Sequence, residues 1–101
     1  MTKILAVISD FILSVKTDTI LKNHSHKLEY LKDDTNLDNY DLILLDLSDN
    51  RSLDIIKKVP RKCIAFGSHL DIDLLNKAKE LGCKNVLARS KFFEDLASLI
   101  K

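Results

Sequence analysis

The 101-residue sequence has no tryptophan, a single proline, two glycines and two cysteines. With so few breakers, and with no linker, charge block, repeat or low-complexity tract, there is no internal boundary to place. Hydrophobic residues make up 46% of the chain and charged residues 31%, which is ordinary for one globular unit. We therefore expect residues 1–101 to form a single domain with one core.

No charge of one sign predominates. Sixteen Lys and Arg residues stand against fifteen Asp and Glu residues, so the net charge is +1. No segment combines basic with aromatic side chains in the way that a nucleic-acid surface requires. We therefore do not expect nucleic acid as a partner.

The sequence also lacks a long hydrophobic run. The longest runs, Ile4–Ile8 and Leu42–Leu45, are far shorter than the roughly 20 residues that span a bilayer. The first three residues lead into a strand pattern without the layout of a signal peptide. We expect a soluble, cytoplasmic protein with no membrane partner.

Several kinds of site are missing as well. Cys63 and Cys83 show no CxxC spacing and form no zinc set with the three histidines. We expect them to be structural thiols that lie close together and stay reduced. No Gly-rich phosphate loop follows the first apolar run, and no nucleophile elbow appears, so nucleotide, flavin and hydrolase sites are disfavoured. We expect no enzyme activity and no cofactor.

Short strand patterns recur along the chain. Lys3–Ile8, Asp41–Asp46 and Lys62–Phe66 contain continuous apolar runs, typical of strands that are covered on both faces. Lys27–Lys32 alternates apolar and charged residues, which indicates an edge strand. Asn85–Ala88 is a fifth, short strand.

Helical spacing of apolar residues appears between and after these strands. The spaced residues are Phe11, Ile12, Val15 and Thr19 up to Leu21; Leu53, Ile56 and Val59; Ile72, Leu75, Ala78 and Leu81; and Phe92, Phe93, Leu96, Leu99 and Ile100. Ser9 or Asp10 can cap the first helix and Asp71 the third. Pro60 should end the second helix and Gly82 the third.

The segment Asp33–Tyr40 has room for no more than one helical turn, because it is rich in residues that bond their own backbone. Strands that alternate with helices pair in parallel through right-handed crossovers. We therefore predict a three-layer α/β sandwich with a five-stranded parallel sheet in the order 2-1-3-4-5. The helix after the second strand should be shortened or absent.

Polar residues follow the carboxyl ends of four strands, and in parallel sheets such residues gather in one crevice where ligands bind. The predicted crevice residues are Ser9, Asp10, Asp46, Gly67, Ser68, His69, Arg89 and Ser90. Asp46 follows four apolar residues, so its carboxylate needs a partner or a function, unless it only anchors the next turn. His69 can act as a base or a pH switch, or merely fill a loop.

These patterns resemble the receiver domains of two-component signalling. Tyr40–Leu47 is similar to the receiver strand that ends in the phosphoacceptor aspartate, here Asp46, and Lys3–Asp10 and Leu81–Leu87 resemble two further receiver segments. The chain resembles short stand-alone receiver-like proteins of prokaryotes more closely still, in the segments Asp10-Phe11, Gly67–Asp71 and Arg89–Phe92. The resemblance implies a flavodoxin-like fold, like that of the chemotaxis regulator.

The chain departs from receivers at the residues that support phosphorylation. Receivers hold Mg²⁺ with an acidic pair after the first strand, and here Ser9 precedes Asp10, so Asp10 and Asp46 are the candidate metal ligands. The strand-five lysine aligns with Arg89, and the usual Thr or Ser falls at Gly67 or Ser68. We expect Arg89 to form ion pairs with Asp10 and Asp46 in a cluster that needs no metal.

These features favour a non-enzymatic regulatory module, a degenerate receiver-like domain that acts by protein binding. A phosphoacceptor receiver, phosphorylated on Asp46 with Mg²⁺, is the alternative, and a small-ligand sensor at the crevice is the third possibility. The expected partner, another protein or a second copy, binds the helix Asp71–Leu81, the strand Asn85–Ala88 and the final helix, which receiver-like proteins commonly use. That face carries mixed charge from Lys77, Lys79, Glu80, Lys84, Lys91, Glu94 and Asp95.

Overall fold

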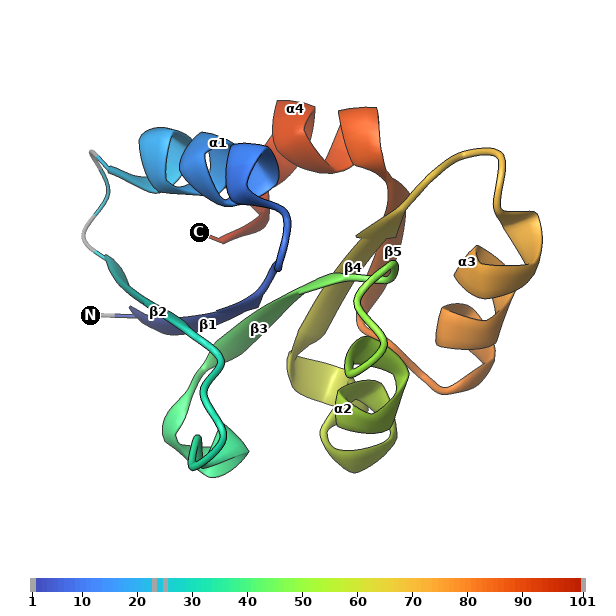
Figure 1. Ribbon diagram of the computed structural model, residues 1–101, viewed down its shortest axis with the longest axis horizontal. Coiled ribbons are helices and arrows are strands. Elements are labelled where there is room, and N and C mark those ends of the chain that lie inside the picture. The colour runs from blue at the N-terminus through green and yellow to red at the C-terminus, as the bar shows by residue number, and fades with distance from the viewer. Residues whose placement is uncertain (1, 23, 25, 101) are drawn as a thin grey trace.

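The computed structural model describes residues 2–22, 24 and 26–100, and Met1, Asn23, Ser25 and Lys101 lie outside the described residues. One sheet contains five parallel strands in the order β2-β1-β3-β4-β5, which confirms the predicted topology (Figure 1). The elements are β1 (Thr2–Val7), α1 (Phe11–Leu21), β2 (His26–Tyr30), the 3₁₀ turn η1 (Leu37–Asn39), β3 (Leu42–Asp46), α2 (Ser52–Lys58), the 3₁₀ turn η2 (Pro60–Lys62), β4 (Cys63–Gly67), α3 (Ile72–Glu80), β5 (Asn85–Ala88) and α4 (Arg89–Leu99).

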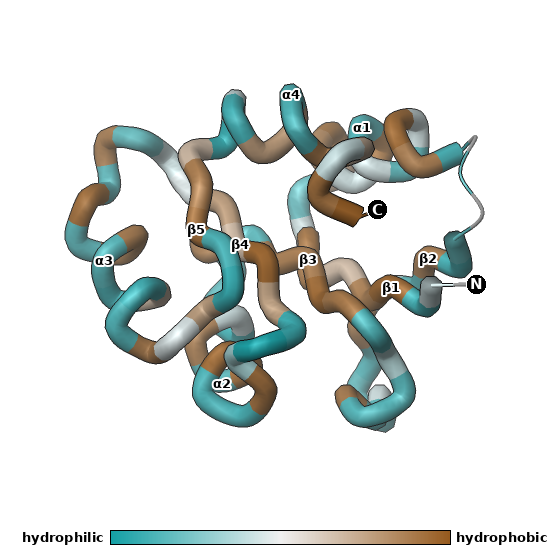
Figure 2. Tube along the Cα trace, turned by 180° about the vertical axis from the view of Figure 1, so that it is seen from behind, coloured by the Kyte–Doolittle hydropathy of each residue, from teal (hydrophilic) through white to brown (hydrophobic). Residues whose placement is uncertain are grey.

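Helices cover both faces of the sheet. α1 and α4 lie side by side over one face, and α2 and α3 lie over the other (Figure 1). Ile4 and Leu44 pack toward α1 and α4, whereas Leu5 and Leu45 pack toward α2 and α3, because successive side chains of a strand point to opposite faces. Figure 2 shows the same pattern as a hydrophobic centre enclosed by more polar helices.

Three aromatic rings hold α4 on the sheet. Phe66 of β4 lies 4.4 Å from Phe92 and 5.3 Å from Phe93 between ring centroids, and Phe92 and Phe93 meet edge to face at 4.9 Å. Such pairs contribute roughly 0.5–1.5 kcal/mol beyond the burial of their surface. Because α4 follows β5 directly, this packing also fixes the carboxyl end of β5.

The connection between β2 and β3 contains one helical turn, η1, as predicted for Asp33–Tyr40. Asn36 caps this turn by accepting a hydrogen bond from the Asp38 amide at 3.0 Å. The Tyr40 hydroxyl then donates to Glu29 Oε1 at 2.6 Å, which ties the end of the connection back to β2. This hydrogen bond lowers the pKa of Glu29 and raises the pKa of Tyr40.

The rotation of α1 differs from what the spaced residues suggested. Phe11, Ile12 and Val15 are 78%, 75% and 44% exposed, so they lie on the outer side of the helix. The side facing the protein is formed by Leu13, Thr17, Ile20 and Leu21. Spacing could not decide between the two sides, because α1 carries apolar residues all round.

Thr17 is fully buried and satisfies its hydroxyl inside the helix, by donating to the Leu13 carbonyl at 2.8 Å. Ala78 of α3 is buried, and Leu75 of α3 and Leu81, which follows α3, pack against the core as predicted. Ile72 is 62% exposed, so its predicted place on the buried side is wrong. Ile72 is the first residue of α3.

Cys63 and Cys83 are free thiols that lie close together. The Cys83 Sγ donates to the Cys63 carbonyl at 3.2 Å, and the Cys63 Sγ donates to the Val59 carbonyl at 3.3 Å. Burial raises the pKa of Cys63 to about 12 and also raises the pKa of Cys83. Both sulfurs therefore stay protonated at neutral pH, which suits structural thiols.

A helix that could cross a bilayer would have to be long and apolar, and none of the helices described here meets both conditions.

Replacement of Gly82 by alanine should destabilise the protein by about 1 kcal/mol. Gly82 follows α3 with φ of 88°, in the left-handed region, while the nearest atom to an added Cβ is Pro60 Cβ at 3.6 Å. The cost therefore comes from the backbone and not from a clash. Urea unfolding measures it, with Gly82→Asn as the control, because asparagine tolerates this conformation better and should lose less. Equal losses in both variants would contradict the explanation.

Candidate functional site

The carboxyl ends of β1, β3, β4 and β5 meet at one edge of the sheet. The register pairs Val7 with Leu45, Asp46 with Phe66, and Gly67 with Ala88. The loops that follow these strands therefore surround a common crevice. The residues that could bind or react there are the polar residues of these loops.

Asp46 ends β3 and is 2% exposed. Its Oδ1 accepts hydrogen bonds from the Ser48 amide at 2.9 Å and from the Ser48 hydroxyl at 2.7 Å. Its carbonyl oxygen accepts a further bond from the Ser52 hydroxyl at 2.6 Å. These contacts close the turn between β3 and α2. Asp46 therefore anchors the turn that follows it, which was the alternative to a functional role.

A second carboxylate, that of Asp49, lies in the same turn and is 8% exposed. Arg51 donates to it in bidentate fashion, with Nε 3.0 Å from Oδ1 and Nη2 2.7 Å from Oδ2. The Ser9 hydroxyl, just after β1, donates to Asp49 Oδ2 at 2.5 Å. The Arg51 guanidinium, helped by Ser9, lowers the pKa of Asp49 well below its usual range despite the opposing effect of burial.

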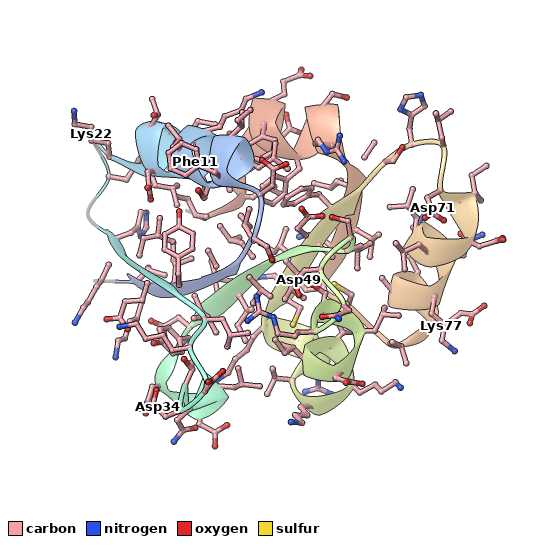
Figure 3. All side chains as sticks on the ribbon, in the orientation of Figure 1. Phe11, Lys22, Asp34, Asp49, Asp71 and Lys77 are labelled. Atoms are coloured by element: carbon pink, nitrogen blue, oxygen red, sulfur yellow. The ribbon has the colours of Figure 1, made fainter. Side chains whose placement is uncertain are left out.

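Asp49 and Arg51 were not predicted from the sequence. Figure 3 shows Asp49 near the middle of the molecule, on the loop that follows β3. The available signal was an acid and an arginine two residues apart in a turn-prone stretch. That pattern is common in solvated turns, and only the approach of Ser9 from β1 shows that this carboxylate is enclosed.

Asp10 and Arg89 do not join Asp46. Asp10 is exposed and caps α1, with its Oδ1 accepting from the Leu13 amide at 3.0 Å. Arg89 is exposed at the start of α4. None of the ion pairs within the described part of the chain links Arg89 to Asp10 or Asp46, so the expected cluster is wrong. Each carboxylate is taken instead by donors close to it in the sequence.

The remaining crevice residues are part of loops and helix starts. The Ser68 hydroxyl accepts from the Leu70 amide at 3.2 Å and shapes the turn before α3. His69 is exposed in that turn, and Ser90 is exposed in the first turn of α4. Gly67 ends β4, and a Cβ there would lie 3.3 Å from Leu75 Cδ2, so the end of this strand offers close packing and no hydroxyl.

The donors in the crevice do not fit a Mg²⁺ ion of the kind that receivers hold. Such an ion prefers near-octahedral oxygen ligands, including carboxylates. Oδ1 of Asp10 caps α1, Oδ1 of Asp46 is bonded by Ser48, and both oxygens of Asp49 are bonded by Arg51. Across residues 2–22, 24 and 26–100, no group of three or more His, Cys, Asp or Glu side chains is arranged to hold a metal ion.

A pocket of about 510 Å³ opens between the β2–β3 connection and α2. It is lined by Leu31, Lys32, Asp33, Thr35, Leu37, Asn50, Arg51, Asp54, Ile55 and Lys58. Apolar side chains and charges of both signs share the lining. None of the predicted crevice residues contributes to it, although Arg51 connects it to Asp49.

No protein-family model and no curated protein sequence shows a significant match to this chain. Solved structures do match. A response regulator receiver domain protein from Clostridium thermocellum has a TM-score of 0.79 and 17% identity, covering 99% of this chain and 91% of that chain. The Mn²⁺-bound form of response regulator Rcp1 has a TM-score of 0.69 and 24% identity, covering 99% and 89%.

The phosphorylated cyanobacterial phytochrome response regulator RcpA has a TM-score of 0.73 and 20% identity, covering 99% of this chain and 89% of that chain. At identities this low, the similarity shows a shared arrangement of strands and helices and gives no information on the chemistry of the site. The alignment covers nearly all of this chain, with its five parallel strands in the order β2-β1-β3-β4-β5. The chain therefore has the flavodoxin-like fold of response regulator receiver domains.

Proposed function

We propose that the chain is a non-enzymatic regulatory module, a degenerate receiver-like domain that acts by binding another protein. The observation that carries this proposal is the engagement of the acidic crevice side chains by the protein's own donors. Asp10 is bonded by α1, Asp46 by Ser48 and Asp49 by Arg51. Phosphoryl transfer requires carboxylates that are free to share a metal ion with the incoming phosphate.

The Asp49–Arg51 pair gives the crevice one stable arrangement. Its carboxylate side chain is 3% exposed and is held by two guanidinium bonds and by Ser9. Charge-assisted bidentate bonds are stronger than neutral ones, and freeing a buried carboxylate from them leaves it without compensation. Because Ser9 belongs to the β1–α1 loop, the pair also ties two crevice loops together. A fixed crevice favours constitutive binding over switching.

The α3–β5–α4 face is the surface where we place the partner. β5 is an edge strand, and its four residues are only partly buried. α3 and α4 flank it (Figure 1). Lys91 pairs with Asp95 at 3.3 Å, while Glu94 is exposed beside them, so the face offers mixed charge for selective docking. We place the module in the cytoplasm, where free thiols such as Cys63 and Cys83 persist.

Phosphorylation of Asp46 with Mg²⁺ is the second candidate function. It is favoured by the position of Asp46 at the end of β3, in a fold shared with phosphorylated RcpA and Mn²⁺-bound Rcp1. Ligand sensing is the third. The pocket beside Arg51 has the volume of many ligand sites, roughly 300–1,000 Å³, which moves this candidate from the predicted crevice to the β2–β3 connection.

Acetyl phosphate with Mg²⁺ should phosphorylate the purified protein poorly or not at all, because Oδ1 of Asp10, Oδ1 of Asp46 and both oxygens of Asp49 are already bonded. Intact mass spectrometry measures the labelled fraction, with an active receiver as the positive control. Asp46→Asn identifies any signal that belongs to Asp46. Near-complete labelling that disappears in Asp46→Asn would overturn the degenerate receiver in favour of the phosphoacceptor.

Replacement of Arg51 by alanine should cost roughly 1 kcal/mol at pH 7, a modest value because the Arg51 side chain is 48% exposed. The folded pKa of Asp49 is lowered, so the pair stabilises the fold above the unfolded pKa near 4, and this contribution is lost as the pH falls through the folded pKa. In urea unfolding between pH 3 and 7, the free energy of unfolding should therefore decrease less on acidification in Arg51→Ala than in the wild type.

The matched control for this experiment is Arg61→Ala, which removes an exposed arginine from η2. Its stability should follow the wild-type pH dependence within a few tenths of a kcal/mol. An Arg51→Ala variant with the same slope as the wild type would show that the pair does not act on the fold.

Charge reversal on the α3–β5–α4 face should abolish partner capture. The double variant Lys91→Glu, Glu94→Lys keeps the net charge and should leave the melting temperature nearly unchanged, because both residues are exposed. Capture from a lysate of the source organism is compared by mass spectrometry. The control is Asp54→Lys, Lys57→Glu, which reverses an exposed pair on α2. Loss of capture in both variants, or in neither, would reject this face.

A further inference from the structure

The outer side of α1 is an exposed apolar stripe. Phe11 is 78% exposed, Ile12 75% and Val15 44%, and Thr19 is exposed one turn further along. We call these four residues the outer stripe. At 3.6 residues per turn they point away from Leu13, Thr17 and Leu21, which pack against the protein. The apolar side of a helix is ordinarily covered, and the outer stripe of α1 is exposed.

The polar groups around the stripe are turned away from it or are already bonded. Lys16 Nζ lies 4.9 Å from the centre of the Phe93 ring on α4, and Asp18 accepts from the Tyr30 hydroxyl of β2 at 2.9 Å. The Ser14 and Thr19 hydroxyls donate to the carbonyls of Phe11 and Val15 at 2.7 and 2.8 Å. Thr19 therefore presents its methyl group, and the stripe has no unsatisfied hydroxyl to hydrate.

The two ends of α1 carry opposite charges. Asp10 caps the amino-terminal end, Lys22 caps the carboxyl-terminal end, and both are exposed. Phe11 is the first residue of α1, and Figure 3 shows Lys22 just beyond the other end of the helix. Phe11 and Thr19 each lie four residues from Val15, so these three residues of the stripe are symmetric about Val15 in sequence, whereas the counterpart of Ile12 is Asp18. After a two-fold rotation, Phe11, Val15 and Thr19 can therefore meet the same three residues of a second copy.

We propose that α1 is a self-association face, at which two copies of the chain pair with their α1 helices antiparallel. Val15 packs on Val15 of the second copy, and Phe11 packs on the methyl group of Thr19, twice. Asp10 of each copy then lies near Lys22 of the other, at both ends of the contact. This surface differs from the α3–β5–α4 face, and the proposal does not rest on the proposed function.

Charge and size distinguish a second copy from other occupants. A membrane surface requires basic residues along the polar margin of the helix, and here Lys16 is turned to α4 and the opposite margin carries Asp18. One helix face is smaller than the roughly 800 Å² per partner of stable complexes. We therefore expect a weak dimer with a dissociation constant on the order of 100 µM.

Sedimentation equilibrium of the full chain from about 10 µM to about 1 mM tests the dimer, a range that brackets the expected constant. Val15→Lys should raise the dissociation constant at least about tenfold, because it places two ammonium groups together on the two-fold axis. The control is Ile72→Lys, which makes the same change at a 62% exposed apolar residue on α3 and should leave the constant unchanged. Both sites are exposed, so both variants should fold.

A second measurement locates the contact directly. Val15→Cys should form a disulfide-linked dimer under mild oxidation, because the two Val15 side chains meet, whereas Ile72→Cys and the wild type, with its buried Cys63 and partly buried Cys83, should not. Non-reducing electrophoresis shows the difference.

Three outcomes would overturn the proposal. The first is a wild-type chain that stays monomeric to about 1 mM, well above the expected constant. The second is association that Val15→Lys leaves intact and the Lys91, Glu94 double variant removes, which would move the contact to the α3–β5–α4 face. The third is a monomer that sediments with phosphatidylglycerol vesicles through Val15, which would assign α1 to a membrane surface. Loss of α1 pairing alone leaves the proposed partner capture unaffected, so the two proposals fail separately.

Discussion

Because the central strands β1, β3 and β4 are apolar on both faces, the sheet has to be covered twice, and every other feature follows from how it is covered. Ile4 and Leu44 require α1 and α4 on one side, and Leu5 and Leu45 require α2 and α3 on the other. The crossovers that place helices on both sides bring all strand ends to one edge. The crevice is thus a consequence of covering the sheet, before any residue in it has a function.

Within the crevice, short-range donors prevail over long-range partners. Asp46 could meet Arg89 only across two strand ends, while Ser48 reaches it within one turn at 2.7 Å. Asp10 likewise finds the amide of Leu13 at the start of α1. Bonds within a turn order few additional side chains, so they cost less conformational entropy than a bridge between two long charged residues. Asp49 follows the same rule through Arg51, two residues away, and it is the exception only in its additional bond from Ser9 of the β1–α1 loop.

α1 carries more apolar surface than the sheet can use. Burial of Leu13, Ile20 and Leu21 is sufficient to dock the helix, and Phe11, Ile12 and Val15 remain outside. Exposed apolar residues that occur singly are normal in proteins, whereas a contiguous helical stripe of them is a mark of an interaction surface. A chain that contains a fixed crevice, an edge face of mixed charge and an apolar helix face has three distinct surfaces on one small receiver-like fold.

The strand order, the single helical turn between β2 and β3 and the end of α3 at Gly82 could be predicted from the sequence, and the cap of α1 was narrowed to Ser9 or Asp10. Apolar runs, capping residues and a left-handed glycine act within a few residues, so their signals are local. The tertiary structure was needed to show that Ser9 encloses the Asp49 carboxylate and that Phe11 faces outward. The direction of a turn side chain depends on which loop approaches it. The rotation of a helix that carries apolar residues on opposite sides depends on the sheet beneath it. Neither the approaching loop nor the sheet is near in the sequence to the residues that it orients.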